Sequence, residues 1–254
     1  MNAVVVIPLY KEEPSEDEML SLRQCFSVLG NHDIVFLAPE GLSLNKYMDI
    51  GSPARVESFD SGYFDSIDDY NRLLRSECFY AAFVKYQYML IYQLDCYVFR
   101  DELLDWCSYG LSYVGPPWLN YDFLKESNNP LKYIPGIGSF LASVGNGGFS
   151  LRNVQLHRDL ARKYALLSKV MRVNEDLFWC SIVSRLEKKY RLPSVEMALN
   201  FAFELEPRWS FKQCNSRLPF GCHAWKKYDA GFWAAHIPVN GVLHADEQCH
   251  FCDV

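Results

Sequence analysis

The stretch that decides the fold is Ala-Val-Val-Val-Ile-Pro at residues 3–8, followed by Asp-Ile-Val-Phe-Leu-Ala at residues 33–38. Each is a short apolar run, rich in β-branched residues and closed by a turn former, which is typical of a strand buried on both faces of a parallel sheet. Between the two runs, Ser15 and Glu18 have the spacing of a capping box, and apolar residues then recur at helical spacing. The pattern therefore predicts a βαβ unit with a right-handed crossover.

The remainder of the chain continues this alternation less regularly. Residues 88–94 (YMLIYQL) predict a further buried strand, and Asn146-Gly147 between apolar flanks predicts a hairpin. Polar residues punctuated by proline and glycine predict a surface loop over residues 119–138. Helical spacing or caps predict helices over 67–83, 101–107, 160–171 and 174–190, and one that begins after Ser194. We therefore predict an α/β fold with a mixed, mostly parallel central sheet flanked by helices.

Composition excludes several classes of protein. The chain has 254 residues, half of them hydrophobic and 15% aromatic, which is enough apolar surface for a sizeable core and too much for a disordered chain. Lysine and arginine number 25 against 31 acidic residues, so the net charge of −6 argues against a broad nucleic-acid surface. No apolar run approaches the roughly 20 residues that span a bilayer, and residues 3–9 do not resemble a secretory signal. We therefore expect a cytoplasmic protein whose nine cysteines are mostly reduced thiols.

Several residues are candidates for chemistry, and each also has a purely structural interpretation. Asp95 follows a predicted strand, where α/β sheets place ligands, but acids also begin turns there. Glu175 and Asp176 open a predicted helix capped by Asn174, where the helix dipole alone favours acids. His223 lies in a constrained aromatic segment, and a lone histidine is more often structural.

Two further patterns, one rich in glycine and one containing a pair of cysteines, each have more than one interpretation. The run Gly145-Asn146-Gly147-Gly148 has more glycine than a hairpin needs, which indicates a close approach to the backbone by a ligand. Cys249-x-x-Cys252, with His244 and His250 beside it, has half the ligands of a structural zinc site, and a frayed terminus explains it equally.

Seven motifs in order resemble the GT-A glycosyltransferases, most closely a family associated with bacterial surface-polysaccharide (capsule and O-antigen) gene clusters. The motifs are VVVIPLYKE at 4–12, YQLDCYVF at 92–99, YVGPPW at 113–118, GNGGFSLR at 145–152, NEDLFW at 174–179, LPSVEMALNFAFE at 192–204 and PFGCHAW at 219–225. The resemblance implies a single GT-A, Rossmann-like domain over residues 1–254. Its half up to about residue 110 would bind a nucleotide sugar, and its half from about residue 111 would bind the acceptor.

On the donor side, the resemblance implies that the segment from Pro8 through Tyr10 to Glu12 cradles the base and ribose. Gln93-Leu94-Asp95 occupies the place of the family's Asp-x-Asp motif, in which the last acid binds a metal that bridges the diphosphate. Asp95 is then a ligand of Mn²⁺ or Mg²⁺, and His223 resembles a late histidine that completes the metal shell. Gln93 stands where the motif has an acid, and its amide can still hydrogen-bond a ribose hydroxyl.

On the acceptor side, Gly147 and Gly148 resemble glycines that let donor sugar and acceptor approach the backbone. Glu175 and Asp176 match an acidic motif at a helix start, which implies that Asp176 removes the acceptor proton and that Glu175 orients a sugar hydroxyl. Trp118 and Trp225 are candidates for stacking on sugar rings.

The resemblance thus implies a metal-assisted, inverting hexosyltransferase in surface polysaccharide biosynthesis. Its donor would be a nucleotide-diphosphate sugar, with UDP as the leading nucleotide, and its acceptor a saccharide or lipid-linked saccharide. No nucleic-acid partner is expected, and peripheral association with a membrane is compatible with such an acceptor.

Three alternatives from other classes remain. A non-catalytic nucleotide- or carbohydrate-binding module on the same fold is kept open by Gln93. A sugar nucleotidyltransferase also places acids at strand ends, although no glycine-rich, basic triphosphate loop follows the first strand. A structural zinc protein built on Cys249 and Cys252 is the third.

Overall fold

The computed structural model describes residues 2–119 and 144–238. In these residues the first predicted unit is confirmed as β1 (Ala3–Pro8), α1 (Glu16–Leu29) and β2 (Asp33–Pro39). Both bonds of the capping box form, because the Ser15 hydroxyl accepts from the Glu18 amide at 3.3 Å and the Glu18 carboxylate accepts from the Ser15 amide at 2.7 Å. Local signals alone therefore produce the start of the fold.

The other elements follow in chain order. They are α2 (Asn45–Met48), β3 (Arg55–Phe59), α3 (Ile67–Leu74), α4 (Glu77–Ala81), β4 (Tyr88–Tyr92), β5 (Tyr97–Val98), α5 (Leu103–Ser108) and β6 (Tyr113–Val114). After the undescribed residues come β7 (Phe149–Asn153), α8 (Val154–Lys163), α9 (Ala165–Val170), α10 (Glu175–Leu177), a π-helical segment (Phe178–Val183) and α11 (Ser184–Leu186). The last are α12 (Val195–Phe201), β8 (Ala202–Phe203), α13 (Pro207–Gln213), β9 (Gly221–Cys222) and α14 (Ala230–Ala234).

The central sheet has six strands in the order β3-β2-β1-β4-β7-β6. The first four are parallel, whereas β7 runs antiparallel to both β4 and β6. The strand order reverses direction along the chain beside β1 and β4, which is where open α/β sheets bind ligands beyond the carboxyl ends of their strands. The predicted fold class, an α/β protein with a mostly parallel sheet, is confirmed.

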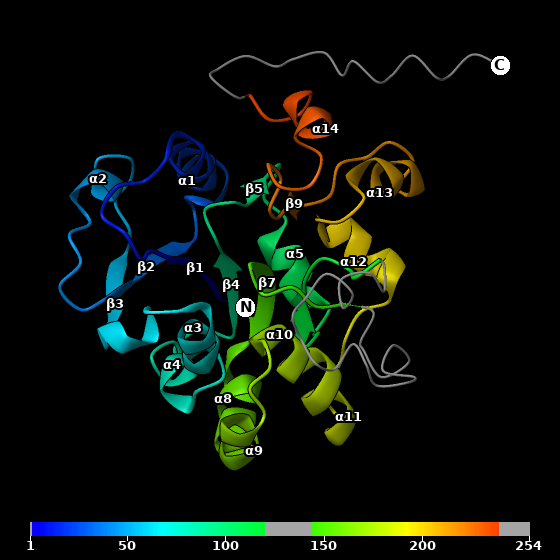
Figure 1. The fold of residues 1–254 in the computed structure, drawn as a ribbon. Coiled ribbons are helices and arrows are strands. Elements are labelled where there is room, and N and C mark those ends of the chain that lie inside the picture. The colour runs from blue at the N-terminus through cyan, green and yellow to red at the C-terminus, as the bar shows by residue number, and fades with distance from the viewer. Residues whose placement is uncertain (1, 120–143, 239–254) are drawn as a thin grey trace.

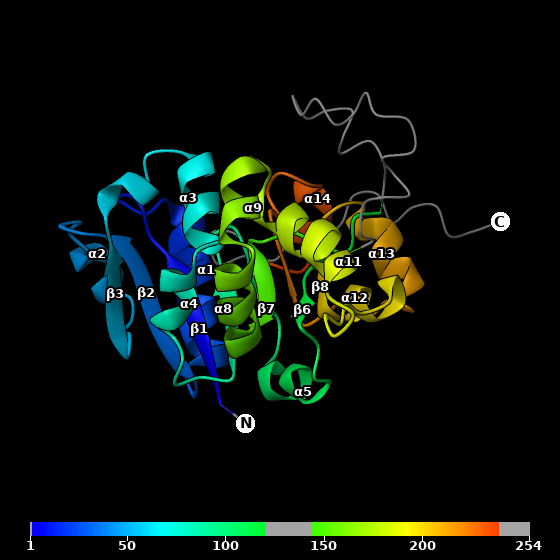
Figure 2. The same cartoon turned by 90° about the horizontal axis from the view of Figure 1, so that it is seen from below.

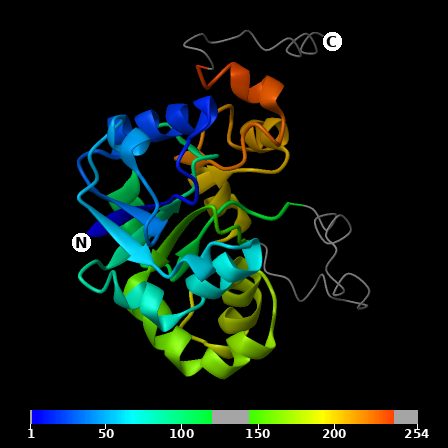
Figure 3. The ribbon, with the colours of Figure 1, turned by 60° about the vertical axis from the view of Figure 1, so that its left-hand side comes forward.

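Alternate residues of the central strands face two separate cores, so the molecule has three layers (Figures 1 and 2). Val5 and Ile7 of β1 pack in the core beneath α1 and α5, and Val4 and Val6 pack in the core beneath α3, α4 and α8. Figure 3 shows α1 and α14 on one side of the sheet and α8 and α9 on the other. Burial on both faces explains why the strands read as continuous apolar runs.

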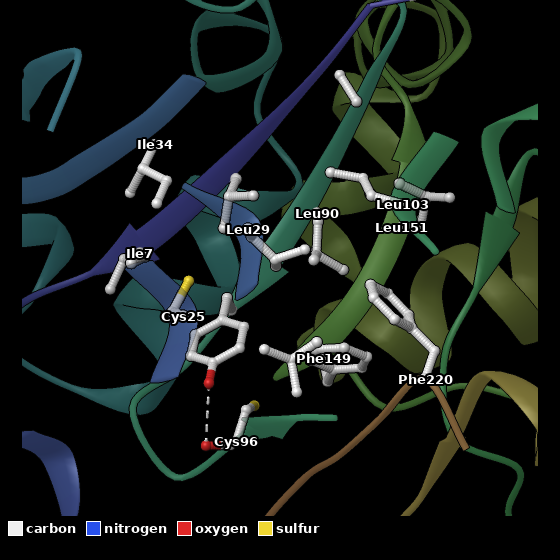
Figure 4. Close-up of a cluster of buried hydrophobic side chains, with 14 of the residues drawn as sticks. Ile7, Cys25, Leu29, Ile34, Leu90, Cys96, Leu103, Phe149, Leu151 and Phe220 are labelled. Atoms are coloured by element: carbon white, nitrogen blue, oxygen red, sulfur yellow. Dashed lines mark hydrogen bonds between the residues drawn. The ribbon is translucent and has the colours of Figure 1, made fainter. Parts of the chain in front are cut away.

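The core beneath α1 continues to the functional end of the sheet (Figure 4). Leu90 of β4 and Phe149 of β7 lie close to Phe220, which precedes β9. The hydroxyl of Tyr92 donates to the backbone oxygen of Cys96 at 3.3 Å, which ties the turn after β4 to the core. A second, three-stranded sheet with the order β5-β9-β8 extends from this turn. Packing therefore holds the segment around Asp95 from both sides.

Some predicted boundaries are wrong for reasons visible in the structure. The predicted helix over 67–83 is two helices, because the Ser76 hydroxyl caps α4 and accepts from the Phe79 amide at 3.3 Å. The predicted helix over 160–171 is likewise divided, since α8 ends before Tyr164 and α9 starts after it. The helix predicted over 174–190 becomes α10, the π-helical segment and α11, and it ends at Leu186.

The predicted hairpin at Asn146-Gly147 is also wrong. Val144 pairs with Pro117 and Leu151 pairs with Val114, so the residues on both sides of Asn146 follow the same neighbouring strand. The chain therefore continues in one direction past a bulged loop, in which Asn146 adopts a left-handed conformation with φ of 65°. An Asn-Gly pair satisfies the backbone of such a loop as well as that of a hairpin. The predicted surface loop over 119–138 lies almost wholly outside the described residues.

None of the described helices is long and apolar enough to cross a membrane. The seven described cysteines are all free thiols.

Candidate active site

A cavity of about 470 Å³ opens beyond the carboxyl ends of β1 and β4. Its lining includes four of the predicted donor-binding residues, Pro8, Tyr10, Gln93 and Asp95. The cavity is also lined by Leu9, Lys11, Glu18, Tyr47, Phe64, Ser66, Ile67, Tyr70 and Leu94. Glu12 does not line the cavity and its side chain is exposed, so the structure does not place it with the other four.

Large apolar side chains stand exposed at this cavity. Tyr10 is 64% exposed and Ile67 is 78% exposed, although such side chains are normally covered. The hydroxyl of Tyr70 is buried and has no hydrogen-bond partner among the described residues. A cavity wall that offers an exposed ring and an aliphatic side chain beside polar groups can bind a ligand that has a flat apolar part and a polar part.

Asp95, which lines the cavity, meets His223, which does not line it, although 127 residues separate the two in the chain. The Nε2 atom of His223 lies 3.3 Å from Oδ1 of Asp95 and 3.4 Å from Oε1 of Gln93. Burial disfavours the ionised form of Asp95, but His223 outweighs it and lowers the pKa of Asp95 below its usual value. The Asp95 side chain is about half exposed toward the cavity, with a relative accessibility of 53%.

Glu204 supports His223 from behind. Its Oε1 atom lies 3.2 Å from Nδ1 of His223, and its Oε2 atom is buried without a described partner. Burial disfavours the imidazolium form of His223, but Glu204 and Asp95 outweigh it and raise the pKa of His223 to about 10. The carboxylate of Glu204 therefore orients the ring so that Nε2 faces Asp95.

This group of side chains fits a divalent cation. An oxygen of Asp95 and Nε2 of His223 lie close enough to bind one ion, and carboxylate oxygen is the ligand type that Mg²⁺ and Mn²⁺ share. The imidazole nitrogen favours a transition metal such as Mn²⁺ over Mg²⁺ at this place. A histidine ligand usually donates its second N–H to a carboxylate, as His223 can to Glu204. A cation bound to Nε2 of His223 would replace the proton that Nε2 otherwise shares with Oδ1 of Asp95.

Cys96 also lies within this group, but its sulfur is already engaged. The thiol donates to the backbone oxygen of Gly148 at 3.3 Å, and burial raises the pKa of Cys96 well above its usual value. Thiolate, not thiol, is the ligand form. Cys96 therefore holds the glycine loop in place as a neutral donor.

Gly147 and Gly148 join the Asp95–His223 pair to the second acidic pair. A Cβ atom at Gly148 would lie 2.1 Å from Nε2 of His223, and one at Gly147 would lie 1.8 Å from Oε1 of Glu175. The His223 ring and the Glu175 carboxylate therefore each contact the glycine loop, at neighbouring residues. The close approach predicted for these glycines is therefore made by side chains of the site itself.

Replacing Gly148 with alanine is expected to weaken Mn²⁺-dependent binding of nucleoside diphosphates by about tenfold or more. The new methyl group would displace the His223 ring and also approach Oε1 of Gln93, 2.7 Å away. Calorimetric titration with UDP and GDP in Mn²⁺ measures the effect. Gly231→Ala is the matched control, since its Cβ meets nothing closer than 3.7 Å. Equal binding by Gly148→Ala and the parent chain would contradict the geometry.

Glu175 is buried and held in place by partners from distant parts of the chain. Its Oε1 atom accepts from Arg152 at 2.7 Å, and its backbone N–H donates to the Asn71 side chain at 2.8 Å. The predicted cap at Asn174 forms no side-chain bond, so Asn71 satisfies this helix start instead. The second carboxylate oxygen of Glu175 is buried without a described partner, which leaves an acceptor free for a ligand.

Asp176 is poised to exchange a proton near neutral pH. Burial and the neighbouring charge of Glu175 raise the pKa of Asp176 to about 7, although the Leu177 amide donates to its Oδ1 at 2.7 Å. A general base is most effective when its pKa lies near the working pH. The π-helical segment begins immediately after α10, and such segments occur often at functional sites.

The remaining predicted site residues are placed differently. Trp118 is half-buried against Gly145, where a Cβ would lie 2.0 Å from its ring. Trp225 is 3% exposed in a core with Phe232 and Trp233, so the conformation gives its ring a packing role and no free face. Cys249, Cys252, His244 and His250 lie outside the described residues.

Sequence reasoning assigned no role to Glu204, Arg152 or Asn71. Glu204 directly follows β8, and an acid after a buried strand is the signal that marked Asp95. Arg152 is fully buried in β7, where an apolar residue is normally expected. Lys227 was also missed, and its charge adds to the lowering of the pKa of Asp95.

Solved structures with a similar fold are glycosyltransferases. Core-mannan synthase A from Aspergillus fumigatus, in its Mn/GDP form, matches with a TM-score of 0.51 and 12% identity over 71% of this chain and 68% of that chain. The galactosyltransferase LgtC, in complex with donor and acceptor sugar analogs, matches at 0.50 and 13% over 93% and 91%. The apo glycosyltransferase GlyE from Streptococcus pneumoniae matches at 0.51 and 13% over 88% and 54%. At these identities the likeness establishes a GT-A fold.

A search of curated proteins finds no match. The model of one protein family, described as a protein of unknown function (DUF5672), matches residues 53–223, about two thirds of the chain. The matched part contains Asp95, Gly148, Asp176 and His223. The chain therefore belongs to the DUF5672 family, with the GT-A fold that glycosyltransferases use.

Proposed function

We propose that this chain is a glycosyltransferase that moves a sugar from a nucleotide-diphosphate sugar to a hydroxyl of a saccharide or lipid-linked saccharide. One observation carries the proposal: His223, which pairs with Asp95, and Glu175, which directly precedes the acid with the raised pKa, Asp176, both meet the glycine loop at Gly147-Gly148, and Asp95 lines a cavity with exposed apolar walls. We also propose a donor-binding half up to about residue 110 and an acceptor-binding half beyond it, with His223 of the second half reaching Asp95 of the first.

In the proposed complex, the nucleotide base lies against Tyr10 and Ile67, and Gln93 hydrogen-bonds a ribose hydroxyl. The diphosphate lies toward Asp95 and His223. When bound there, Mn²⁺ or Mg²⁺ supplies positive charge that stabilises the departing diphosphate. Lys227, whose charge already reaches Asp95, adds to that charge at the mouth of the site.

The proposed chemistry is a single displacement with inversion. Asp176 takes the proton of the acceptor hydroxyl as its oxygen forms a bond to the anomeric carbon. The bond from that carbon to the diphosphate oxygen breaks on the opposite face, and its electron pair leaves with the nucleoside diphosphate. The free Oε2 of Glu175 accepts a hydrogen bond from a sugar hydroxyl and fixes the orientation of the reacting ring.

The proposal also names a class of donor and a biosynthetic pathway. A UDP-hexose is the first candidate donor, and a GDP-sugar the second, since the core-mannan synthase A structure holds GDP. Synthesis of a bacterial surface polysaccharide is the proposed setting, based on the resemblance of the seven motifs.

Asp95→Ala is expected to abolish the Mn²⁺-dependent stabilisation of the protein by UDP or GDP. A ligand present at about 100 times its dissociation constant stabilises the folded state by about 2.7 kcal/mol, and the removal of one ligand side chain weakens that linkage. Thermal unfolding in the presence of each nucleotide, with Mn²⁺ or with a chelator, measures the effect. Asp105→Ala, in an exposed position of α5, is the matched control. If chelation and Asp95→Ala both leave the nucleotide effect unchanged, the metal assignment is wrong.

A donor-binding module without turnover is the alternative that Gln93 favours, because a neutral amide stands where the family motif has an acid. Slow hydrolysis of the nucleotide sugar in the absence of acceptor separates the two. Release of free sugar that depends on Asp95 supports the enzyme, and binding without any release supports the module.

A further inference from the structure

The charge of this acidic protein is distributed unevenly. Residues 158–191 contain nine lysines and arginines and four acids, whereas the remainder of the chain contains 16 basic and 27 acidic residues. Two of the four acids, Glu175 and Asp176, belong to the active site, and Glu187 is paired with Lys163. Arg158 and Arg162 are paired with Glu77 of α4, so the excess of basic charge comes from the other six lysines and arginines of the segment, which all lie between residues 169 and 191.

Aliphatic side chains stand exposed on the same segment. Leu166 and Val170 of α9 are 79% and 81% exposed, and Leu186 at the end of α11 is 53% exposed. Leu166 and Val170 lie one helical turn apart on one face of α9. The two helices lie near each other in Figures 1 and 2, and Glu187 joins them because it accepts from the Tyr164 hydroxyl at 2.8 Å.

We use the name basic-aliphatic surface for the three aliphatic residues together with exposed cations of the same segment of the chain. Its members are Leu166, Val170, Leu186, Lys169, Arg172, Arg185, Lys188 and Lys189. No carboxylate of the described residues forms an ion pair with Lys169, Arg172, Lys188 or Lys189. Of these four, only Lys189 lies near enough to a carboxylate in the described part of the chain to contribute to lowering its pKa, that of Glu187, which is already paired with Lys163.

We propose that the basic-aliphatic surface docks on an anionic lipid bilayer. Aliphatic side chains enter the boundary between headgroups and acyl chains, while surrounding lysines and arginines attract anionic headgroups. A nucleic acid would make use of the cations but not of exposed leucine and valine. A protein interface would be expected to have aromatic anchors at its centre, and this surface has none among its members.

The surface is connected directly to the proposed base. The chain from Asp176 to Leu186 is continuous helix through α10, the π-helical segment and α11, and ten residues at 1.5 Å each span about 15 Å. Docking through this end would hold the active site close to the membrane surface, within reach of a saccharide carried on a lipid. That consequence depends on the proposed function, but the docking itself does not.

Co-sedimentation with vesicles tests the docking on the full chain. Vesicles of phosphatidylcholine with about 30% phosphatidylglycerol are compared with pure phosphatidylcholine vesicles at about 0.1 M salt. Binding is expected on the anionic vesicles only. Leu166→Ser/Val170→Ser is expected to weaken the partition coefficient about tenfold. Lys169→Gln/Lys189→Gln is expected to weaken it about 30-fold, at about 1 kcal/mol for each lysine.

Matched controls come from exposed positions elsewhere. Val84→Ser/Leu104→Ser removes aliphatic residues that are 49% and 44% exposed, and Lys85→Gln/Lys212→Gln removes two exposed lysines. Both should bind vesicles like the parent chain. Equal binding to neutral and anionic vesicles, or equal binding by the aliphatic variant, overturns the proposal. So does sedimentation velocity in which Leu166→Ser/Val170→Ser turns a dimer into a monomer, because the surface would then join two copies of the chain. Nucleotide binding should be unchanged in all variants, so its loss would concern the proposed function instead.

Discussion

Asp176→Asn is expected to lower kcat for sugar transfer by about two to four orders of magnitude, the range that a general base contributes. The amide is nearly isosteric with the carboxylate but cannot accept the acceptor proton. Donor binding should change little, since Asp176 is not among the residues that line the cavity. Initial rates of nucleoside diphosphate release, with nucleotide affinity measured separately, give both quantities.

Asp159→Asn is the control for this substitution, because Asp159 is exposed on α8. Turnover of Asp176→Asn within about tenfold of the parent chain would exclude Asp176 as the base. Glu175 would then be the next candidate.

The pH profile gives a second measure of Asp176. Its pKa of about 7 means that the basic form is a minority below neutral pH, so kcat should rise from pH 6 to pH 8 and then level off. The same raised pKa means that the folded chain binds this proton more tightly than the unfolded chain. Its contribution to stability is therefore present below about pH 4 and is lost as the pH rises through 7. Asp176→Asn should remove both dependences.

Arg152→Met is expected to lower the free energy of unfolding by about 3–5 kcal/mol, the cost of leaving a buried charge without its partner. Arg152 is fully buried and donates to Glu175 at 2.7 Å, to the Ser150 hydroxyl at 2.9 Å and to the Tyr80 hydroxyl at 3.2 Å. Burial opposes its charge, but Glu175 outweighs that effect and raises the pKa of Arg152 well above its usual value. Urea denaturation measures the loss.

A second substitution separates the charge from the packing. Arg152→Met/Glu175→Gln should be more stable than Arg152→Met alone, because the stranded carboxylate is gone. Arg162→Met, which removes an exposed ion pair with Glu77, should change stability little. If the double variant is no more stable than Arg152→Met alone, the unpaired charge is not the cause.

The structure also explains why part of the site was predictable. Asp95 and Glu204 both follow buried strands, Asp95 after β4 of the six-stranded sheet and Glu204 after β8 of the three-stranded sheet, and α/β sheets place ligands beyond the carboxyl ends of their strands. Glu175 and Asp176 stand at a helix start, which the sequence pattern marks by itself. The roles of Glu12 and Trp225 were harder to predict, because exposure at a cavity depends on how distant segments pack. Trp225 is covered by α14, which nothing in its own neighbourhood indicates.

The sequence by itself determined the first βαβ unit and the buried strand that precedes Asp95, whose end it placed two residues too late. Those features depend on hydrophobic period, caps and turn formers, which act over a few residues. Only the tertiary structure decided that His223 meets Asp95, that Arg152 pairs with Glu175, and that the pKa of Asp176 is raised to about 7. Each of these depends on burial and on charges brought together from elements far apart in the chain, and no local pattern encodes such distances.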